Sequence, residues 1–112
     1  MIPRRPIVVL LGIALALWGG AARADSIDGR WCFTDGRDMT INGPMIVTPG
    51  GLRTTGTYDR HGFAYKVPDA EAGAGTMISM ILVNETTVHL WRREAQRGQP
   101  PEQIWRRCAP SS

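Results

Sequence analysis

The stretch from residue 52 to residue 67, LRTTGTYDRHGFAYKV, decides the predicted fold. Its first half is rich in Thr, and its second half alternates aromatic or branched side chains with small or charged ones. Alternation with a period of two in such a composition is typical of a half-buried β-strand. A polar turn, Asp59 to Gly62, separates the halves. We therefore predict a β-hairpin, whose second arm carries this apolar face: Phe63, Tyr65 and Val67.

The first 24 residues have the three-part layout of a secretory signal peptide. Arg4 and Arg5 precede an apolar run at residues 7–18, and Ala22 and Ala24 supply small residues before Asp25. The apolar run is shorter than the roughly 20 residues that a membrane-spanning helix needs. We expect cleavage after Ala24, with a retained anchor as the alternative. Residues 25–112 then form a single small β domain in the periplasm or outside the cell, with no stable membrane span.

Loss of the leader removes the net charge of the chain. The leader carries three of the 13 Lys and Arg residues and none of the 10 Asp and Glu residues, so residues 25–112 are formally neutral. A basic surface that would bind nucleic acid is therefore not expected. The sequence indicates a partner other than nucleic acid.

The two cysteines, Cys32 and Cys108, lie near opposite ends of the exported segment. They lack the CxxC spacing and the neighbouring His of a metal or redox site, and export places them in an oxidising compartment. We predict a structural disulfide between them. In the chain-entropy model such a bridge contributes about 4 kcal/mol, which is a large share of the stability of a small domain.

Short strands separated by turn signals fill the rest of the chain. This pattern predicts an all-β fold, an antiparallel meander of about eight strands closed as a small β-barrel, with a β-sandwich as the alternative. Pro44 should place the third strand at an edge or a bulge. Six of the seven residues at 77–83 are apolar, which predicts a strand buried on both faces. The expected strands are residues 30–33, 38–41, 45–47, 52–58, 63–67, 76–83, 88–92 and 104–108.

Candidate contact residues cluster in and beside the central hairpin. Loops commonly carry function, so the turn at residues 59–62 and the breaker-rich loop at residues 68–75 are the expected contact elements. A His beside an Asp could act as a general base, but neighbouring side chains on a turn splay apart and no nucleophile motif accompanies them. We predict no enzyme activity and these partner-binding residues: Tyr58, Asp59, Arg60, His61, Tyr65 and Lys66.

A copper site is a weaker alternative. His61, His89, Met77 and Met80 are residue types that bind copper. The odd spacing of the two methionines, however, puts them on opposite faces of a strand. We therefore expect no metal and no cofactor.

These features favour a binding protein, monomeric or weakly dimeric, for a protein or cell-envelope partner. The outline is similar to that of small exported, disulfide-closed barrels that inhibit lysozyme or proteases, although no segment matches theirs residue by residue. An inhibitor of a secreted or periplasmic enzyme is the most concrete form of this hypothesis. The alternative is a small-molecule or lipid carrier, with the aromatic side chains around a ligand cavity.

Overall fold

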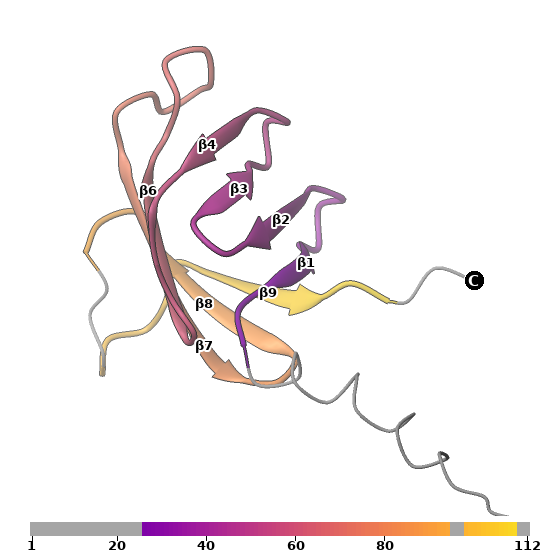
Figure 1. Ribbon diagram of the computed structural model, residues 1–112. Helices are drawn as coiled ribbons and strands as arrows, with labels where there is room; N and C mark the ends of the chain where they lie inside the picture. Colours follow the sequence, from indigo (N-terminus) through magenta and orange to yellow (C-terminus); the bar gives the residue numbers. More distant parts are fainter. Residues whose placement is uncertain (1–25, 95–97, 110–112) are drawn as a thin grey trace, which may run out of the picture.

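The computed structural model describes residues 26–94 and 98–109 (Figure 1). In this part of the chain nine antiparallel strands form one sheet, and there is no helix. The strands are β1 (Gly29–Cys32), β2 (Asp38–Asn42), β3 (Met45–Val47), β4 (Arg53–Thr55), β5 (Thr57–Asp59), β6 (Gly62–Lys66), β7 (Met77–Asn84), β8 (Thr87–Trp91) and β9 (Gln103–Arg107).

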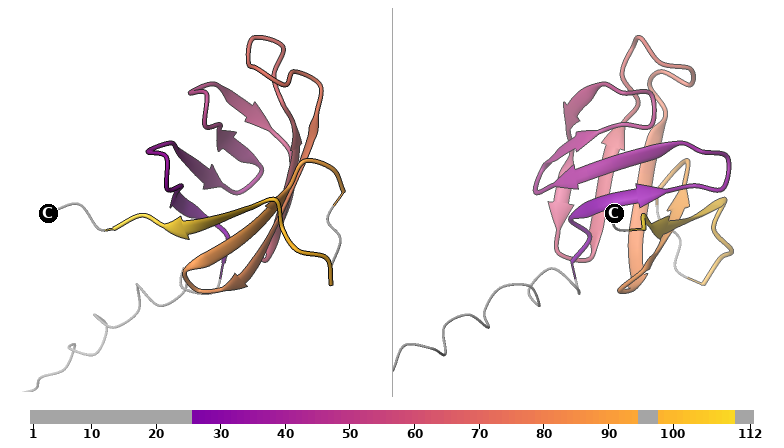
Figure 2. Two further views of the ribbon diagram at one scale, coloured as in Figure 1. Left: turned by 180° about the vertical axis from the view of Figure 1, so that it is seen from behind. Right: turned by 90° about the vertical axis from the view of Figure 1, so that its right-hand side faces the viewer.

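The sheet curls into a nearly closed barrel (Figure 2). Its strand order is β4-β3-β2-β1-β9-β8-β7-β6-β5, so the first and last strands of the chain are neighbours in the middle of the sheet. The predicted small antiparallel β-barrel is confirmed. Strand β3 lies between β2 and β4, so it is not at an edge, and Pro44 stands just before it.

The two edge strands, β4 and β5, are consecutive in the sequence and are separated by Gly56 alone. β4 pairs with β3, whereas β5 pairs with β6. The stretch predicted as one strand at residues 52–58 therefore changes partner at Gly56, which is why nine strands form where eight were expected. The predicted hairpin forms over residues 57–64; residues 53–55 pair with β3 and residues 65–66 with β7, so the outer parts of the two arms do not pair with each other.

Gly56 permits this change of partner because it has no side chain. Its N–H donates a hydrogen bond to the carbonyl oxygen of Pro44 at 2.9 Å, next to β3. A Cβ at this position would lie 2.2 Å from the carbonyl oxygen of Ala64 and 2.8 Å from the ring of Phe63. No side chain fits at these distances, so the corner that closes the barrel requires glycine.

The inner face of the barrel is the hydrophobic core. Its largest fully buried side chains are those of Trp31 and Trp105. Strand β7 is buried on both faces over Ile78–Met80, but Met77 and Val83 are 41% and 44% exposed on its outer face. The prediction of burial along the whole strand is therefore wrong at its ends. The buried core comprises Ile27, Trp31, Met39, Ile41, Ile46, Phe63, Tyr65, Val67, Ile78, Met80, Val88, Leu90 and Trp105.

The predicted disulfide is confirmed: Cys32 at the end of β1 bonds to Cys108, which directly follows β9, across a sequence separation of 76 residues. The two strands share two register pairs, Trp31 with Arg107 and Cys32 with Arg106. The bridge thus covalently reinforces a short seam between strands from opposite ends of the chain.

The predicted leader, residues 1–24, and its cleavage site after Ala24 lie outside the described residues. Within residues 26–94 and 98–109, no helix has the length and apolar character needed to cross a membrane.

Replacement of Gly56 by Ala should destabilise the protein by about 3 kcal/mol, because backbone atoms cannot move away from the added methyl group without breaking the β5–β6 pairing. Gly62→Ala is the matched control. Its added Cβ would come no closer than 3.4 Å to another atom, and its cost should stay within about 1 kcal/mol. Urea unfolding followed by circular dichroism measures both variants, and equal stability of the two would contradict the corner assignment.

Candidate functional site

One end of the barrel is filled by the segment before β1. The side chain of Ile27 is fully buried there. The Ile27 N–H donates to the carbonyl oxygen of Arg60 at 2.8 Å, and its own carbonyl accepts from Nε1 of Trp31 at 2.9 Å. We call this the plugged end, because the Asp28 carboxylate accepts hydrogen bonds from Tyr58 of β5 and from the N–H of Gly43 after β2. An open, polar hollow of about 740 Å³ is lined by Ser26, Asp28 and Tyr58 at the same end.

Arg107 ties the plugged end to the last strand. Its guanidinium carbon lies 4.3 Å from the centre of the Trp31 ring, a cation–π contact. Nη1 donates to the carbonyl oxygen of Asp28 at 2.8 Å and Nη2 to that of Ser26 at 2.9 Å. In the sequence Arg107 lies two residues from Trp105. The structure instead stacks Arg107 on Trp31, a contact that sequence analysis missed.

Tyr58 and the turn that follows it belong to the plugged end. The Tyr58 hydroxyl donates to a carboxylate oxygen of Asp28, and this hydrogen bond to a negatively charged acceptor raises the pKa of Tyr58. The carboxylate of Asp59 accepts from the backbone N–H of His61 at 2.8 Å. The Tyr58 hydroxyl and the Asp59 carboxylate therefore stabilise the local fold. The side chains of Arg60 and His61 are exposed.

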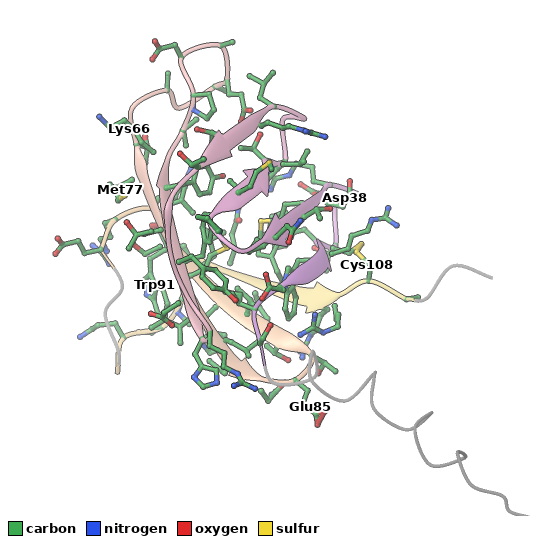
Figure 3. All side chains as sticks on the ribbon, viewed as in Figure 1. Asp38, Lys66, Met77, Glu85, Trp91 and Cys108 are labelled. Carbon is green, nitrogen blue, oxygen red and sulfur yellow. A yellow bond between two sulfur atoms is a disulfide. The ribbon has the colours of Figure 1, made fainter. Side chains whose placement is uncertain are left out.

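The six predicted contact residues do not form one site. Tyr58 to His61 lie at the plugged end, and Tyr65 is buried inside the barrel near the opposite end. Lys66 points outward from β6 beside Met77, its partner on β7, and both lie on the same side of the barrel as Trp91 (Figure 3). The structure thus groups the four turn residues and separates Tyr65 and Lys66 from them.

The opposite end holds a cavity of about 430 Å³, which we call the mouth cavity. The β6–β7 loop, residues 67–76, contributes one wall; it is the loop at the top of Figure 1. Apolar side chains form the inner part: Val67, Ile78, Leu90 and Trp105. The polar side chains around it are Arg37, Tyr65, Glu71, Thr76, Arg92 and Gln103.

Tyr65 contributes an uncommitted hydroxyl to the mouth cavity. The residue is 5% exposed, and within the described residues its hydroxyl has no hydrogen-bond partner. Burial raises the pKa of Tyr65 to about 12, with a further contribution from the nearby charge of Glu71 and an opposing one from Arg37. The phenol therefore stays neutral at ordinary pH and can donate a hydrogen bond to a ligand.

Arg37 lies on the aromatic floor of the mouth. Its guanidinium carbon is 5.5 Å from the centre of the Trp105 ring and 5.3 Å from that of Phe33. Nε donates to a carboxylate oxygen of Asp35 at 2.7 Å. Among residues 26–94 and 98–109 this Nε bond is the only hydrogen bond of the Arg37 guanidinium, so its two terminal nitrogens have no partner there.

Glu71 holds the β6–β7 loop in place. Its carboxylate accepts a hydrogen bond from the hydroxyl of Thr48, which is buried in the turn after β3. The approach is so close that a Cβ on Gly50 would lie 2.5 Å from the Glu71 carboxyl carbon. The loop predicted as a contact element therefore forms a fixed wall of the cavity.

The residues considered for copper do not converge. His61 lies in the β5–β6 turn and His89 on β8, while Met77 is exposed and Met80 faces the core. In the described part of the chain, no group of three or more His, Cys, Asp or Glu residues could hold a metal ion.

Comparison of the chain with protein-family models, with curated proteins and with solved structures finds no match.

The pKa of Tyr65 can be measured in the Tyr58→Phe variant, because the chain has two tyrosines and this variant keeps only Tyr65. Difference ultraviolet spectroscopy should detect phenolate formation near pH 12 in the folded protein. A transition near 10.0, the ordinary value, would contradict the burial of this hydroxyl.

The same shift makes stability depend on alkaline pH. Below pH 10 the phenol is neutral in both the folded and the unfolded chain, so its contribution to stability is fully present. Between pH 10 and pH 12 the unfolded chain releases this proton first, so the free energy of unfolding should fall. In the Tyr65→Phe variant the free energy of unfolding, measured by urea titration, should lose this decrease between pH 10 and pH 12.

Proposed function

We propose that the protein is an exported, non-enzymatic binding protein that holds a small ligand in the mouth cavity. The observation that carries this proposal is the hydroxyl of Tyr65, which opens onto an apolar cavity and has no hydrogen-bond partner in the described residues, although the residue as a whole is only 5% exposed. A hydroxyl without a partner in the protein is free to donate a hydrogen bond to an acceptor atom of a ligand. The confirmed disulfide and the signal-peptide pattern support export.

The size and lining of the mouth cavity support a small ligand. Small-molecule sites typically measure about 300–1,000 Å³ and combine apolar walls with a few convergent polar groups. The 430 Å³ mouth cavity meets both criteria. Its walls are also fixed before a ligand arrives, since Glu71 anchors the loop and the barrel supports the floor. Such preorganisation reduces the entropy lost on binding.

Binding fits the chemistry of Tyr65 better than catalysis does. An efficient general acid or base has a pKa near the working pH. The pKa of Tyr65 is raised to about 12, which makes this phenol a stable hydrogen-bond donor and a poor proton-transfer group at neutral pH. The side chain is thus suited to orient a ligand.

A protein partner on the outer face of the sheet is the second candidate. His89 on β8 pairs with Ile81 on β7 and with Ile104 on β9, so these residues form a row across three strands. Ile104 is 43% exposed, and Val83 and Met77 are similarly exposed on β7. An exposed apolar row is a feature of protein-binding surfaces. An inhibitor of a secreted or periplasmic enzyme would use such a surface.

A neutral apolar fluorophore, N-phenyl-1-naphthylamine, tests the mouth cavity. We expect the purified mature protein to bind it with enhanced dye fluorescence. Ala72→Trp should weaken this binding at least tenfold, because Ala72 lines the cavity from an exposed loop and the indole would occupy the space that the dye needs.

Ala74→Trp is the matched control, since Ala74 is exposed in the same loop but does not line the cavity. It should bind the dye like the unmodified protein. Failure of the unmodified protein to bind, or equal binding by both variants, would contradict the proposed site.

A further inference from the structure

We propose that the ligand of the mouth cavity is a small amphiphilic carboxylate, with its carboxylate between Tyr65 and Arg37 and its apolar tail against Trp105. This inference rests on the proposed function and names the chemical class of ligand. A short fatty acid is the simplest member of that class.

Hydrogen-bond donors predominate among the uncommitted polar atoms of the cavity. The Tyr65 hydroxyl and the terminal nitrogens of Arg37 can both donate, and neither has a hydrogen-bond partner in the described chain. The amide oxygen of Gln103 accepts a hydrogen bond from Nε1 of Trp105 at 3.0 Å. The NH₂ group of Gln103 is then the part of its side chain that can bind a ligand, and it is a donor. Three donor groups around one cavity favour a ligand group with two acceptor oxygens.

Glu71 is the one acidic residue that lines the cavity within the described chain, and its charge opposes that of an anionic ligand. The carboxylate of Glu71 accepts from Thr48 and secures the loop. Two guanidinium groups, those of Arg37 and Arg92, also line the cavity, whereas their acidic neighbours Asp35 and Glu102 do not. The two guanidinium groups outnumber the single carboxylate among the described lining residues, which favours an anionic head group over a cationic one, and guanidinium matches the geometry of a carboxylate.

The positions of Tyr65 and Arg37 define where the head group lies. Both side chains line the cavity, and the Arg37 guanidinium also stacks over the ring of Trp105. A carboxylate bound between the two side chains would have Val67, Ile78, Leu90 and Trp105 below it. Because these side chains are buried in the core, they present little apolar surface to a ligand, and only a short tail fits against them.

Three ligands with the same tail test the head group: octanoate, octanol and octylamine. Isothermal titration calorimetry at neutral pH should give octanoate at least tenfold tighter binding than octylamine, with octanol between them. Arg37→Gln should weaken octanoate roughly tenfold and leave octanol nearly unchanged, because the lost interaction is with a charged group. Tyr65→Phe should weaken both.

Arg53→Gln is the matched control, since it removes an exposed arginine of β4 that does not line the cavity. It should leave octanoate binding unchanged. Tighter binding of octylamine, or equal loss of octanoate binding in Arg53→Gln and Arg37→Gln, would overturn the carboxylate assignment.

The fluorophore separates failure of this inference from failure of the proposed function. Binding of N-phenyl-1-naphthylamine without binding of octanoate would overturn the carboxylate class and leave the mouth as a ligand site. Absence of binding by the dye and by all three eight-carbon ligands would overturn both.

Discussion

The close contact between Gly56 and the backbone of Ala64 is the constraint on which the barrel depends. At this point one continuous segment leaves β3 and joins β6, so the two edges of the sheet are parts of the same stretch of chain. Exposed strand edges promote aggregation, and closure removes them. Gly56 therefore allows the nine-stranded sheet to curl into a nearly closed barrel although its two edge strands, β4 and β5, do not pair with each other.

Closure makes the two ends of the barrel chemically different. At the plugged end the Ile27 side chain is fully buried, while Arg107 donates to the carbonyl oxygen of Asp28 and the Asp28 carboxylate accepts from Tyr58, so these polar residues serve the fold. At the mouth, Trp105 and the aliphatic core lie below a cavity with an uncommitted phenol. Burial of Arg107 lowers its pKa, yet its three carbonyl acceptors and Trp31 hold it in place. The open end is thus the better candidate for a ligand.

Sequence periodicity predicted the strands and the disulfide, since apolar alternation and the position of two cysteines are local or countable features. It could not predict that β4 and β5 have different partners, because the clash at Gly56 arises between residues that are eight positions apart. The same limit applies to the site. The sequence predicts Tyr65 as a contact residue together with Tyr58 of the same hairpin. Strand β6 runs away from the turn, however, so Tyr65 lies near the opposite end of the barrel from Tyr58. The roles of Glu71, Arg37 and Arg107 depend on contacts between distant segments, which leave no sequence pattern.

Amide hydrogen exchange measured by nuclear magnetic resonance tests the closed barrel most directly. The N–H of Gly56 donates to Pro44 at the corner between the edge strands β4 and β5, and the N–H of Ile27, before β1, donates to Arg60 in the turn after β5. If the barrel is closed as described, both amides exchange slowly, as the paired amides of β7 and β8 do. Rapid exchange of Gly56 and Ile27 beside protected β7 and β8 amides would contradict this account, because it would mean that the edges are open in solution.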